Sequence, residues 1–165
     1  MKIRPFAPID LPDLLRIQEE SALGSGWNGG DYLCLTEAPG GLILVACEDG
    51  PNPIVGFVAT NLILDHAELL NVAVAPERRR RGIGKNLILE ACQCTRGAGA
   101  RSISLEVRSS NLPAIRLYRS VGFAACRTRK NYYSAPVENA CVMMLDLTGA
   151  APAGDKDRTG EDLSA

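Results

Sequence analysis

The sequence contains no apolar stretch long enough to cross a membrane. Its longest apolar runs are about five to seven residues, as in Gly41–Cys47, whereas a membrane-spanning helix needs about 20. The first residues, MKIRPFAPIDLPD, also lack the apolar core of a secretory signal and include Asp10 and Asp13. We therefore expect a cytoplasmic protein that does not contact a membrane.

Metal-ligand patterns are missing as well. The chain has one histidine, His66, and six cysteines, none of which forms a CxxC pair. Zinc sites and Cys–His nucleophilic pairs need partners that this sequence does not offer, so we expect no metal and an exposed His66 in a turn. Several cysteines lie inside apolar runs such as LVACE, which predicts buried free thiols in a reducing compartment.

Neither sign of charge dominates the chain. The net charge is −1, and the last 17 residues carry four acidic and two basic side chains, so this tail contributes −2 and the rest +1. These values do not favour direct binding of nucleic acid.

A length of 165 residues is typical of one domain. We expect a single domain over residues 1–148 and a disordered acidic tail over residues 149–165, where Gly, Ala, Pro and Asp dominate.

The hydrophobic pattern predicts a mixed α/β (α+β) fold. Three strand-like runs, Gly41–Glu48, Ile54–Leu64 and Glu68–Ala75, predict an antiparallel meander, and the third run is apolar on both faces and therefore central. Helical periodicity predicts a helix over Gly82–Thr95, and the sequence Asn-Leu-Pro predicts the start of another helix at Asn111. These two helices alternate with the later strands. The further strands are Lys2–Phe6, Arg101–Val107, Phe123–Lys130 and Ala140–Leu147, and the further helices begin at Asp10 and at Asp31, the latter after a connector over Gly24–Gly30. We expect a central, mixed, mostly antiparallel sheet of about six to seven strands flanked by about four helices.

The segment PERRRRGIGKN, between the central strand and the next helix, contains residue types that can bind a phosphate. Gly82 and Gly84 allow a ligand to approach the backbone closely, and the free N–H groups of a first helical turn attract anions. The P-loop pattern is absent, and the dinucleotide pattern GxGxxG fails at Leu87. The residues alone leave two interpretations open, a phosphate or pyrophosphate site and a glycine-rich turn with solvated arginines.

The same segment resembles a known cofactor loop. RRRGIG, at Arg79–Gly84, fits R/Q-x-x-G-x-G/A, the acyl-CoA pyrophosphate loop of the GNAT acetyltransferase superfamily. The blocks ELLNVAV, LEVRSSNLPAIRLYRSVGF and RKNYY resemble, in the same order, those of the RimI-type group. Enzymes of that group are bacterial and acetylate the N-terminal alanine of a small-subunit ribosomal protein. The resemblance spans Glu68 to Leu147 and implies a GNAT-like fold.

The resemblance implies a role for each matching residue. Glu106 matches the proton acceptor, Tyr118 the proton donor and Asn111 an asparagine that contacts the cofactor. Acetyl-CoA is implied as the cosubstrate. Its pantetheine arm would meet the backbone of Val72, Ala73 and Val74, and its pyrophosphate the main-chain N–H groups of Arg80, Arg81, Gly82, Ile83, Gly84 and Lys85. Trp27, Tyr132 and Tyr133 match residues near the peptide substrate.

The spacing of these residues is compatible with one groove. Asn111 and Tyr118 are seven residues apart, two helical turns, so they face the same side of a helix. Glu106 ends the preceding strand, which places a carboxylate, an amide and a phenol together. Without the resemblance, Glu106 and Arg108 would be interpreted as solvent-facing, and the tyrosines as packing residues.

These residues predict a protein N-terminal acetyltransferase that uses direct, acid/base-assisted attack on acetyl-CoA. The expected partner is the N-terminus of a protein, with a small-subunit ribosomal protein as the candidate and an N-terminal alanine as the acceptor. Two alternatives stay open: a GNAT enzyme for a small amine or a lysine side chain, and a non-catalytic acyl-CoA-binding module.

Overall fold

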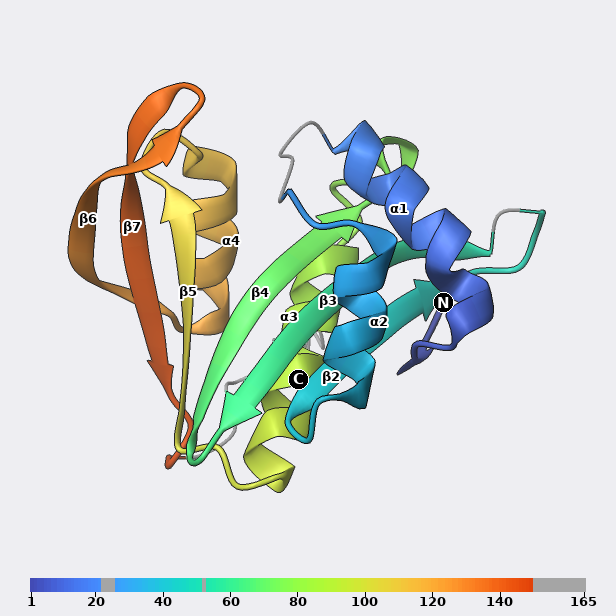
Figure 1. Cartoon of the computed structure of the whole chain (residues 1–165), viewed down its shortest axis with the longest axis horizontal. Helices are drawn as coiled ribbons and strands as arrows, with labels where there is room; N and C mark the ends of the chain where they lie inside the picture. Colours follow the sequence, from blue (N-terminus) through green and yellow to red (C-terminus); the bar gives the residue numbers. More distant parts are fainter. Residues whose placement is uncertain (22–25, 52, 150–165) are drawn as a thin grey trace, which may run out of the picture.

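Seven strands of the computed structural model form one mixed sheet in the order β1-β2-β3-β4-β5-β7-β6 (Figure 1). The structure describes residues 1–21, 26–51 and 53–149, so the predicted tail lies outside the described residues except for Gly149. The strands are β1 (Lys2–Pro5), β2 (Gly41–Cys47), β3 (Ile54–Ile63), β4 (His66–Val74), β5 (Ser102–Arg108), β6 (Ala124–Ser134) and β7 (Val137–Asp146). The predicted fold class is confirmed.

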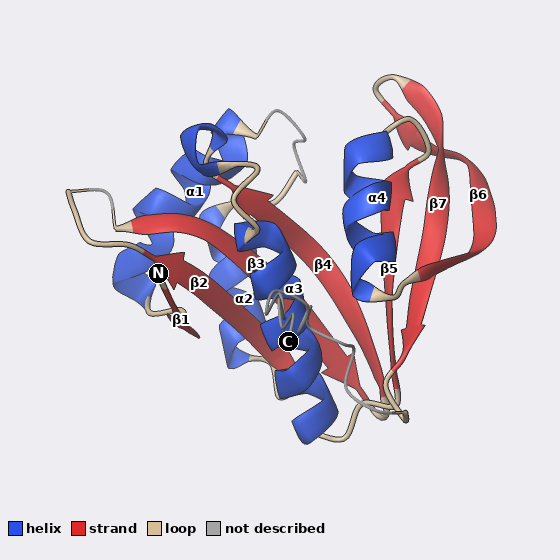
Figure 2. Ribbon diagram, turned by 180° about the vertical axis from the view of Figure 1, so that it is seen from behind, coloured by secondary structure: helices blue, strands red, loops and turns tan. Residues whose placement is uncertain are grey.

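Four α-helices cover the two faces of this sheet in the described part of the chain. Helices α1 (Leu11–Glu20) and α2 (Gly29–Glu37) lie on one face of the β1–β4 half. Helix α3 (Ile83–Gly97) lies on the opposite face, and α4 (Leu112–Val121) lies on that side beside β5 (Figure 2). Among the described residues, no helix is both long and apolar enough to span a membrane.

Strand pairing divides the sheet into two halves. Strands β1 to β4 are antiparallel, as the predicted meander requires, and the β5-β7-β6 half is also antiparallel. The two halves meet in one parallel pair, β4 and β5, which is joined by the α3 crossover. This pair has only three residues on each strand in register, His66–Glu68 with Ser102–Ser104. The strands then diverge, as Figure 1 shows.

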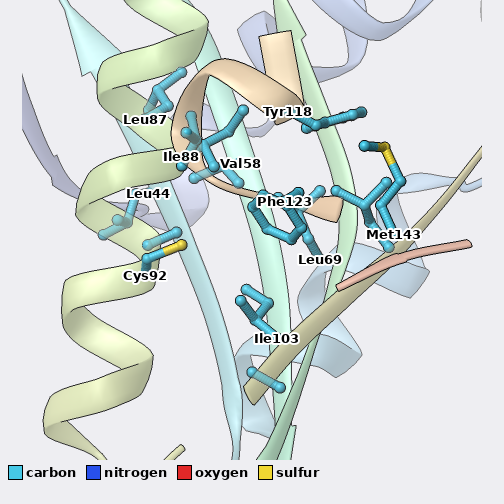
Figure 3. Close-up of a cluster of buried hydrophobic side chains, with 14 of the residues drawn as sticks. Leu44, Val58, Leu69, Leu87, Ile88, Cys92, Ile103, Tyr118, Phe123 and Met143 are labelled. Carbon is cyan, nitrogen blue, oxygen red and sulfur yellow. The ribbon is translucent and has the colours of Figure 1, made fainter. Parts of the chain in front are cut away.

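Two hydrophobic clusters hold the helices to the sheet. The larger one includes Leu87 and Ile88 of α3, Ile103 of β5, Phe123 and Met143, and Figure 3 shows these side chains together. The smaller one packs α1 and α2 against the other face through Leu14, Ile17, Tyr32 and Phe57. Each fully buried Leu, Ile or Phe stabilises the fold by roughly 1.5–3 kcal/mol, so these clusters fix the positions of the strand ends that carry polar residues.

Some local predictions are wrong in their bounds. Helix α2 begins at Gly29 because Asn28 accepts the Asp31 N–H at 3.1 Å while the Asp31 carboxylate accepts the Asn28 N–H at 2.7 Å. This reciprocal cap compensates for two glycines at the start of a helix. The predicted connector over Gly24–Gly30 therefore ends earlier, and its first two residues lie outside the described residues. Strands β6 and β7 extend towards each other as far as Ser134 and Val137.

Two predictions about individual side chains are also wrong. His66 is not an exposed turn residue: it is half-buried at the start of β4, and its ring nitrogens each lie 2.8 Å from the hydroxyl groups of Ser102 and Ser104. All six cysteines are free thiols as predicted, but Cys34 and Cys126 are exposed, and only Cys92 is fully buried.

Candidate active site

The divergence of β4 from β5 opens a cleft of about 700 Å³ between the two halves of the sheet. Its walls come from the middle of β4, the end of β5, the start of α4 and the β6–β7 hairpin. The cleft brings together seven of the residues predicted for the site: Trp27, Val72, Glu106, Asn111, Tyr118, Tyr132 and Tyr133. The predicted loop Arg80–Lys85 is not part of this cleft and lies at the start of α3.

A β-bulge shapes the β4 wall of the cleft. Ala59 of β3 pairs with Asn71, whereas the next residue, Thr60, pairs with Leu69, so Leu70 is an extra residue on β4. Bulges of this kind free backbone groups from the ladder and re-aim side chains. Leu70 and Asn71 both line the cleft. The bulge therefore offers main-chain groups at the place where a substrate would lie.

The residues predicted to contact pantetheine alternate between the two faces of β4. Val72 lines the cleft and Val74 is partly buried beside α3, but the Ala73 side chain is buried in the opposite cluster against α1 and α2. A contact through the side chain of Ala73 is therefore incompatible with its position. The predicted contact through the backbone of this segment stays a prediction.

The start of α3 has the geometry of an anion-binding turn. Arg80 and Gly82 adopt left-handed conformations, with φ of 64° and 77°, and no side chain caps the helix at Gly82. The N–H groups of the first turn are therefore free of intrahelical partners and point out of the helix. A Cβ atom on Gly84 would lie 3.4 Å from Leu117 of α4, an ordinary contact distance, so the turn lies close to the neighbouring helix.

The four consecutive arginines differ in their contacts. Arg78 pairs with Glu48 at 2.8 Å, and Arg79 donates to the carbonyl of Val74 at 3.1 Å. Arg80 and Arg81 are exposed, so their charge is available to a ligand. The first two arginines hold the loop against the sheet, while the side chains of the last two are exposed cations, a kind of group that binds anions.

Glu106 lies in the cleft and is already paired. Its side chain is 20% exposed, and its Oε1 accepts from Nη1 of Arg129, on β6, at 2.5 Å. The Arg129 guanidinium also lies over the ring of Tyr132, 4.5 Å from its centroid. Interaction with the Glu106 carboxylate, followed by burial, raises the pKa of Tyr132. Arg129 was not among the predicted residues, because its contact with Glu106 joins strands that are not neighbours in the sequence.

Tyr118 is the most buried of the predicted site residues in the cleft, with 7% of its surface exposed. Burial raises the pKa of Tyr118 to about 12, with a smaller effect from Tyr133. Its ring packs edge-on against Phe123, with centroids 6.0 Å apart, at one end of the larger cluster (Figure 3). Tyr118 is thus a packed side chain whose phenol stays protonated across the physiological pH range.

Asn111 has a structural role that the resemblance did not include. Its side chain accepts the N–H of Ala114 at 3.2 Å and so caps α4. It also lines the cleft. A cap at this position stabilises the helix by typically about 1 kcal/mol, and it fixes the start of the helix that carries Tyr118.

Arg108 holds the β6–β7 hairpin over the cleft. Its guanidinium lies 4.2 Å from the centroid of the Tyr133 ring, pairs with Glu138 at 3.3 Å and donates to the carbonyl of Pro136 at 3.2 Å. Tyr132 and Tyr133 pack edge-on, with centroids 5.1 Å apart. The interpretation of Arg108 as a simple surface arginine is therefore wrong.

A partly buried polar network supports Trp27 on the opposite wall. Gln18 of α1 donates to the Trp27 carbonyl at 2.8 Å, and the Trp27 ring packs 5.0 Å from that of Tyr32. The Tyr32 hydroxyl bonds to Gln18 and accepts from Asn71 at 2.7 Å. The hydrophobic pattern could not indicate this network, because its members come from α1, α2 and the bulge of β4.

A free helix start with exposed cationic side chains, beside a cleft that contains a carboxylate and a phenol, is an arrangement that suits a group-transfer enzyme with a phosphate-bearing cosubstrate. The acetyltransferase (GNAT) family matches residues 11–123, and the chain belongs to this family. The enzyme class predicted from the sequence, an acetyl-CoA-dependent N-acetyltransferase, is confirmed.

Relatives and solved structures agree with this assignment. The chain is 35% identical over 130 residues to a candidate [ribosomal protein bS18]-alanine N-acetyltransferase of Bacillus subtilis (strain 168). The aligned residues make up 78% of this chain and 85% of that protein. It is 38% identical over 97 residues to the [ribosomal protein bS18]-alanine N-acetyltransferase of Salmonella typhimurium, covering 58% and 66%. The crystal structure of the ribosomal-protein-S18-alanine N-acetyltransferase from Escherichia coli matches 94% of this chain and 97% of its own, with a TM-score of 0.78 and 29% identity. The predicted resemblance to the RimI-type group is confirmed.

Proposed function

We propose that this enzyme transfers the acetyl group of acetyl-CoA to the α-amine of a protein, with the N-terminal alanine of a bS18-type ribosomal protein as the acceptor. The observation that carries this proposal is the cleft in which Glu106 and Tyr118 face one space beside the β4 bulge. The acceptor is taken from the related enzymes, which are [ribosomal protein bS18]-alanine N-acetyltransferases. We also propose that residues 1–148 form one acetyltransferase domain and act in the cytoplasm, where ribosomal proteins are made.

The residues at the start of α3 fit the cosubstrate. The free N–H groups that follow Gly82 and the exposed Arg80 and Arg81 would hold its pyrophosphate, and Lys85 adds a further cation. The backbone of Val72–Val74 would receive the pantetheine arm, with Asn111 at the start of α4 beside it. When bound, acetyl-CoA supplies an acetyl thioester, and the chain orients it towards the cleft.

The proton transfers can be assigned to two side chains. An α-ammonium group has a pKa of about 7.7–8.0, so roughly a tenth to a fifth of it is neutral at pH 7, against under about 0.1% for a lysine. Glu106 would take the proton of the ammonium, directly or through one water. The amine then attacks the thioester carbon, the C–N bond forms and the C–S bond breaks. Tyr118 gives its proton to the leaving thiolate, and the extra proton on the attacking nitrogen passes, directly or through water, to the Tyr118 phenolate. Glu106 releases the proton it took to solvent.

The other walls of the cleft fit an extended peptide. Trp27 lies on one side and Tyr132 and Tyr133 on the other, and Tyr132 is 45% exposed. Aromatic side chains of this kind provide contact area at a low entropic cost. Backbone groups freed by the bulge at Leu70 would stabilise the oxyanion that forms during attack.

The test is a panel of acceptors with acetyl-CoA, measured by thiol release. We expect rapid turnover of a peptide that begins Ala-Arg. The same peptide with a blocked N-terminus and an internal lysine, and small free amines, should react at least tenfold more slowly. Preference for the lysine peptide or for a small amine would contradict the proposal in favour of the corresponding alternative.

A further inference from the structure

The ion pair between Arg129 and Glu106 has a consequence for the base. A glutamate side chain has three rotatable torsions, and holding it in one geometry costs conformational entropy. Arg129 contributes to that ordering through the 2.5 Å contact with Oε1 of Glu106. The guanidinium is itself held over the Tyr132 ring, at 4.5 Å. Arg129 therefore restrains the Glu106 side chain, and the contact with the Tyr132 ring in turn restrains Arg129.

The position of Arg129 in the sheet makes this contact unusual. Arg129 is on the edge strand β6, and β7 lies between β6 and β5, the strand that carries Glu106. The arginine therefore reaches across an intervening strand. Strand β6 has an irregular register between Arg129 and Tyr133, and such irregularities re-aim side chains. The irregular segment begins at Arg129 and includes Tyr132 and Tyr133, the two tyrosines of the cleft.

We propose that Arg129 is a positioning residue for Glu106, orienting the carboxylate so that it can accept the proton of the substrate ammonium. This inference rests on the proposed function of Glu106. A fixed orientation is what a general base requires, and the ion pair with Arg129 restrains the Glu106 carboxylate in one orientation. The other titratable or charged groups around the cleft are Glu68, Arg108, Tyr118, Tyr132, Tyr133 and, bound to Arg108, Glu138.

The neighbouring Arg127 provides a matched control. It lies on the same strand and is exposed like Arg129, whereas the ion pair with Glu106 is made by Arg129. We expect Arg127→Ala to turn over an Ala-starting peptide at the wild-type rate. Arg129→Ala should lower kcat by about tenfold with little change in KM for acetyl-CoA, because the arginine touches neither the α3 loop nor the leaving group.

Two further measurements separate positioning from a structural role. Arg129→Lys keeps the charge and should restore part of the lost kcat, and guanidinium chloride at tens of millimolar should partly rescue Arg129→Ala. In a Glu106→Gln background, Arg129→Ala should have almost no further effect, because residues that act as a unit are not additive. Circular dichroism checks that each variant is folded. Should Arg129→Ala not fold, Arg129→Gln replaces it in the same cycle.

These experiments distinguish a failure of the positioning role of Arg129 from a failure of the proposed function. Wild-type turnover by Arg129→Ala, or an equal loss in the presence and absence of Glu106, would overturn the positioning role while leaving Glu106 as the base. Wild-type turnover by Glu106→Gln alone would instead remove the base from the proposed function, and with it any role for Arg129.

Discussion

Tyr118 combines a packing role with a chemical one, and removing its hydroxyl separates them. Tyr118→Phe keeps the ring that packs against Phe123, so thermal unfolding should change little. Loss of the proton donor should lower kcat about tenfold to a thousandfold. Since the pKa of Tyr118 is raised to about 12, deprotonation of this phenol should not lower wild-type turnover below about pH 10. The measurements are kcat against pH and a thermal melt, and wild-type turnover would assign Tyr118 to packing alone.

Glu106 should matter most where the acceptor amine is protonated. Glu106→Gln should slow acetylation of an Ala-starting peptide most severely at pH 6–7, where the amine is mostly ammonium. As the pH rises past the pKa of the amine, about 8, solution supplies the neutral nucleophile, and the gap between wild type and variant should narrow. Affinity for acetyl-CoA should be unchanged.

The measurement is kcat/KM at pH 6–9 for wild type and for Glu106→Gln, with Glu37→Gln, an exposed glutamate on α2, as the control for the chemical change. A ratio that stays constant across this range would mean that Glu106 positions the substrate and does not remove a proton. The pH dependence of the ratio therefore separates a general base from a residue that only positions the substrate.

At the scale of single elements, helix α3 gives the sharpest test of cosubstrate binding. Gly84→Glu places a side chain in the first turn, where Cβ would lie 3.4 Å from Leu117 and 3.6 Å from Val74. These distances are ordinary contacts, so the fold should survive. The carboxylate, however, would occupy and repel the pyrophosphate site, and we expect affinity for acetyl-CoA to fall at least a hundredfold.

Gly97→Glu is the matched control, because it adds the same charge at the other end of α3 where a Cβ meets nothing within 4 Å. Calorimetric titration with acetyl-CoA and circular dichroism are the two measurements. Unchanged affinity in a folded Gly84→Glu variant would show that the cosubstrate does not use this turn.

The elements themselves differ in how far the sequence predicts them. Strand β4 and helix α3 are indicated by an apolar run and a helical stripe that includes Ile83 and Leu87, both buried. The early start of α2 was also encoded, by Asn28 and Asp31 as a capping pair, but the low helix propensity of Gly29 and Gly30 hid it. Local patterns therefore find elements well and their ends less well.

Pairing across the sheet is beyond local patterns. The sequence predicts strands near β6 and β7, yet it gives no sign that β7 lies between β5 and β6. The contacts of Glu106 with Arg129, and of Arg108 with Glu138, depend on that arrangement. The roles assigned to Glu106 and Tyr118 came from the resemblance, whereas their partners follow only from the order of strands.

At the scale of the whole molecule, the cleft is a consequence of an incomplete sheet. A parallel pair of full length would bury β4 and β5 against each other and leave no space between them. Pairing stops after Glu68 and Ser104, and helices α3 and α4 hold the diverging halves apart from one side (Figure 2). The site is thus built from the inner edges of two antiparallel half-sheets.

His66 lies where those halves join, and its removal should weaken the whole fold. Its ring is 2.8 Å from both Ser102 and Ser104 across the three-residue parallel pair. His66→Ala should lower the free energy of unfolding by about 1–3 kcal/mol, since two hydrogen bonds at a half-buried position are lost. Affinity for acetyl-CoA should hardly change, because the start of α3 follows the opposite end of β4. Urea unfolding of His66→Ala, Ser102→Ala and the double variant measures the coupling. Wild-type stability of His66→Ala would mean that the His66 side chain does not help to join the two halves, and strict additivity in the cycle would mean that its contact with Ser102 does not.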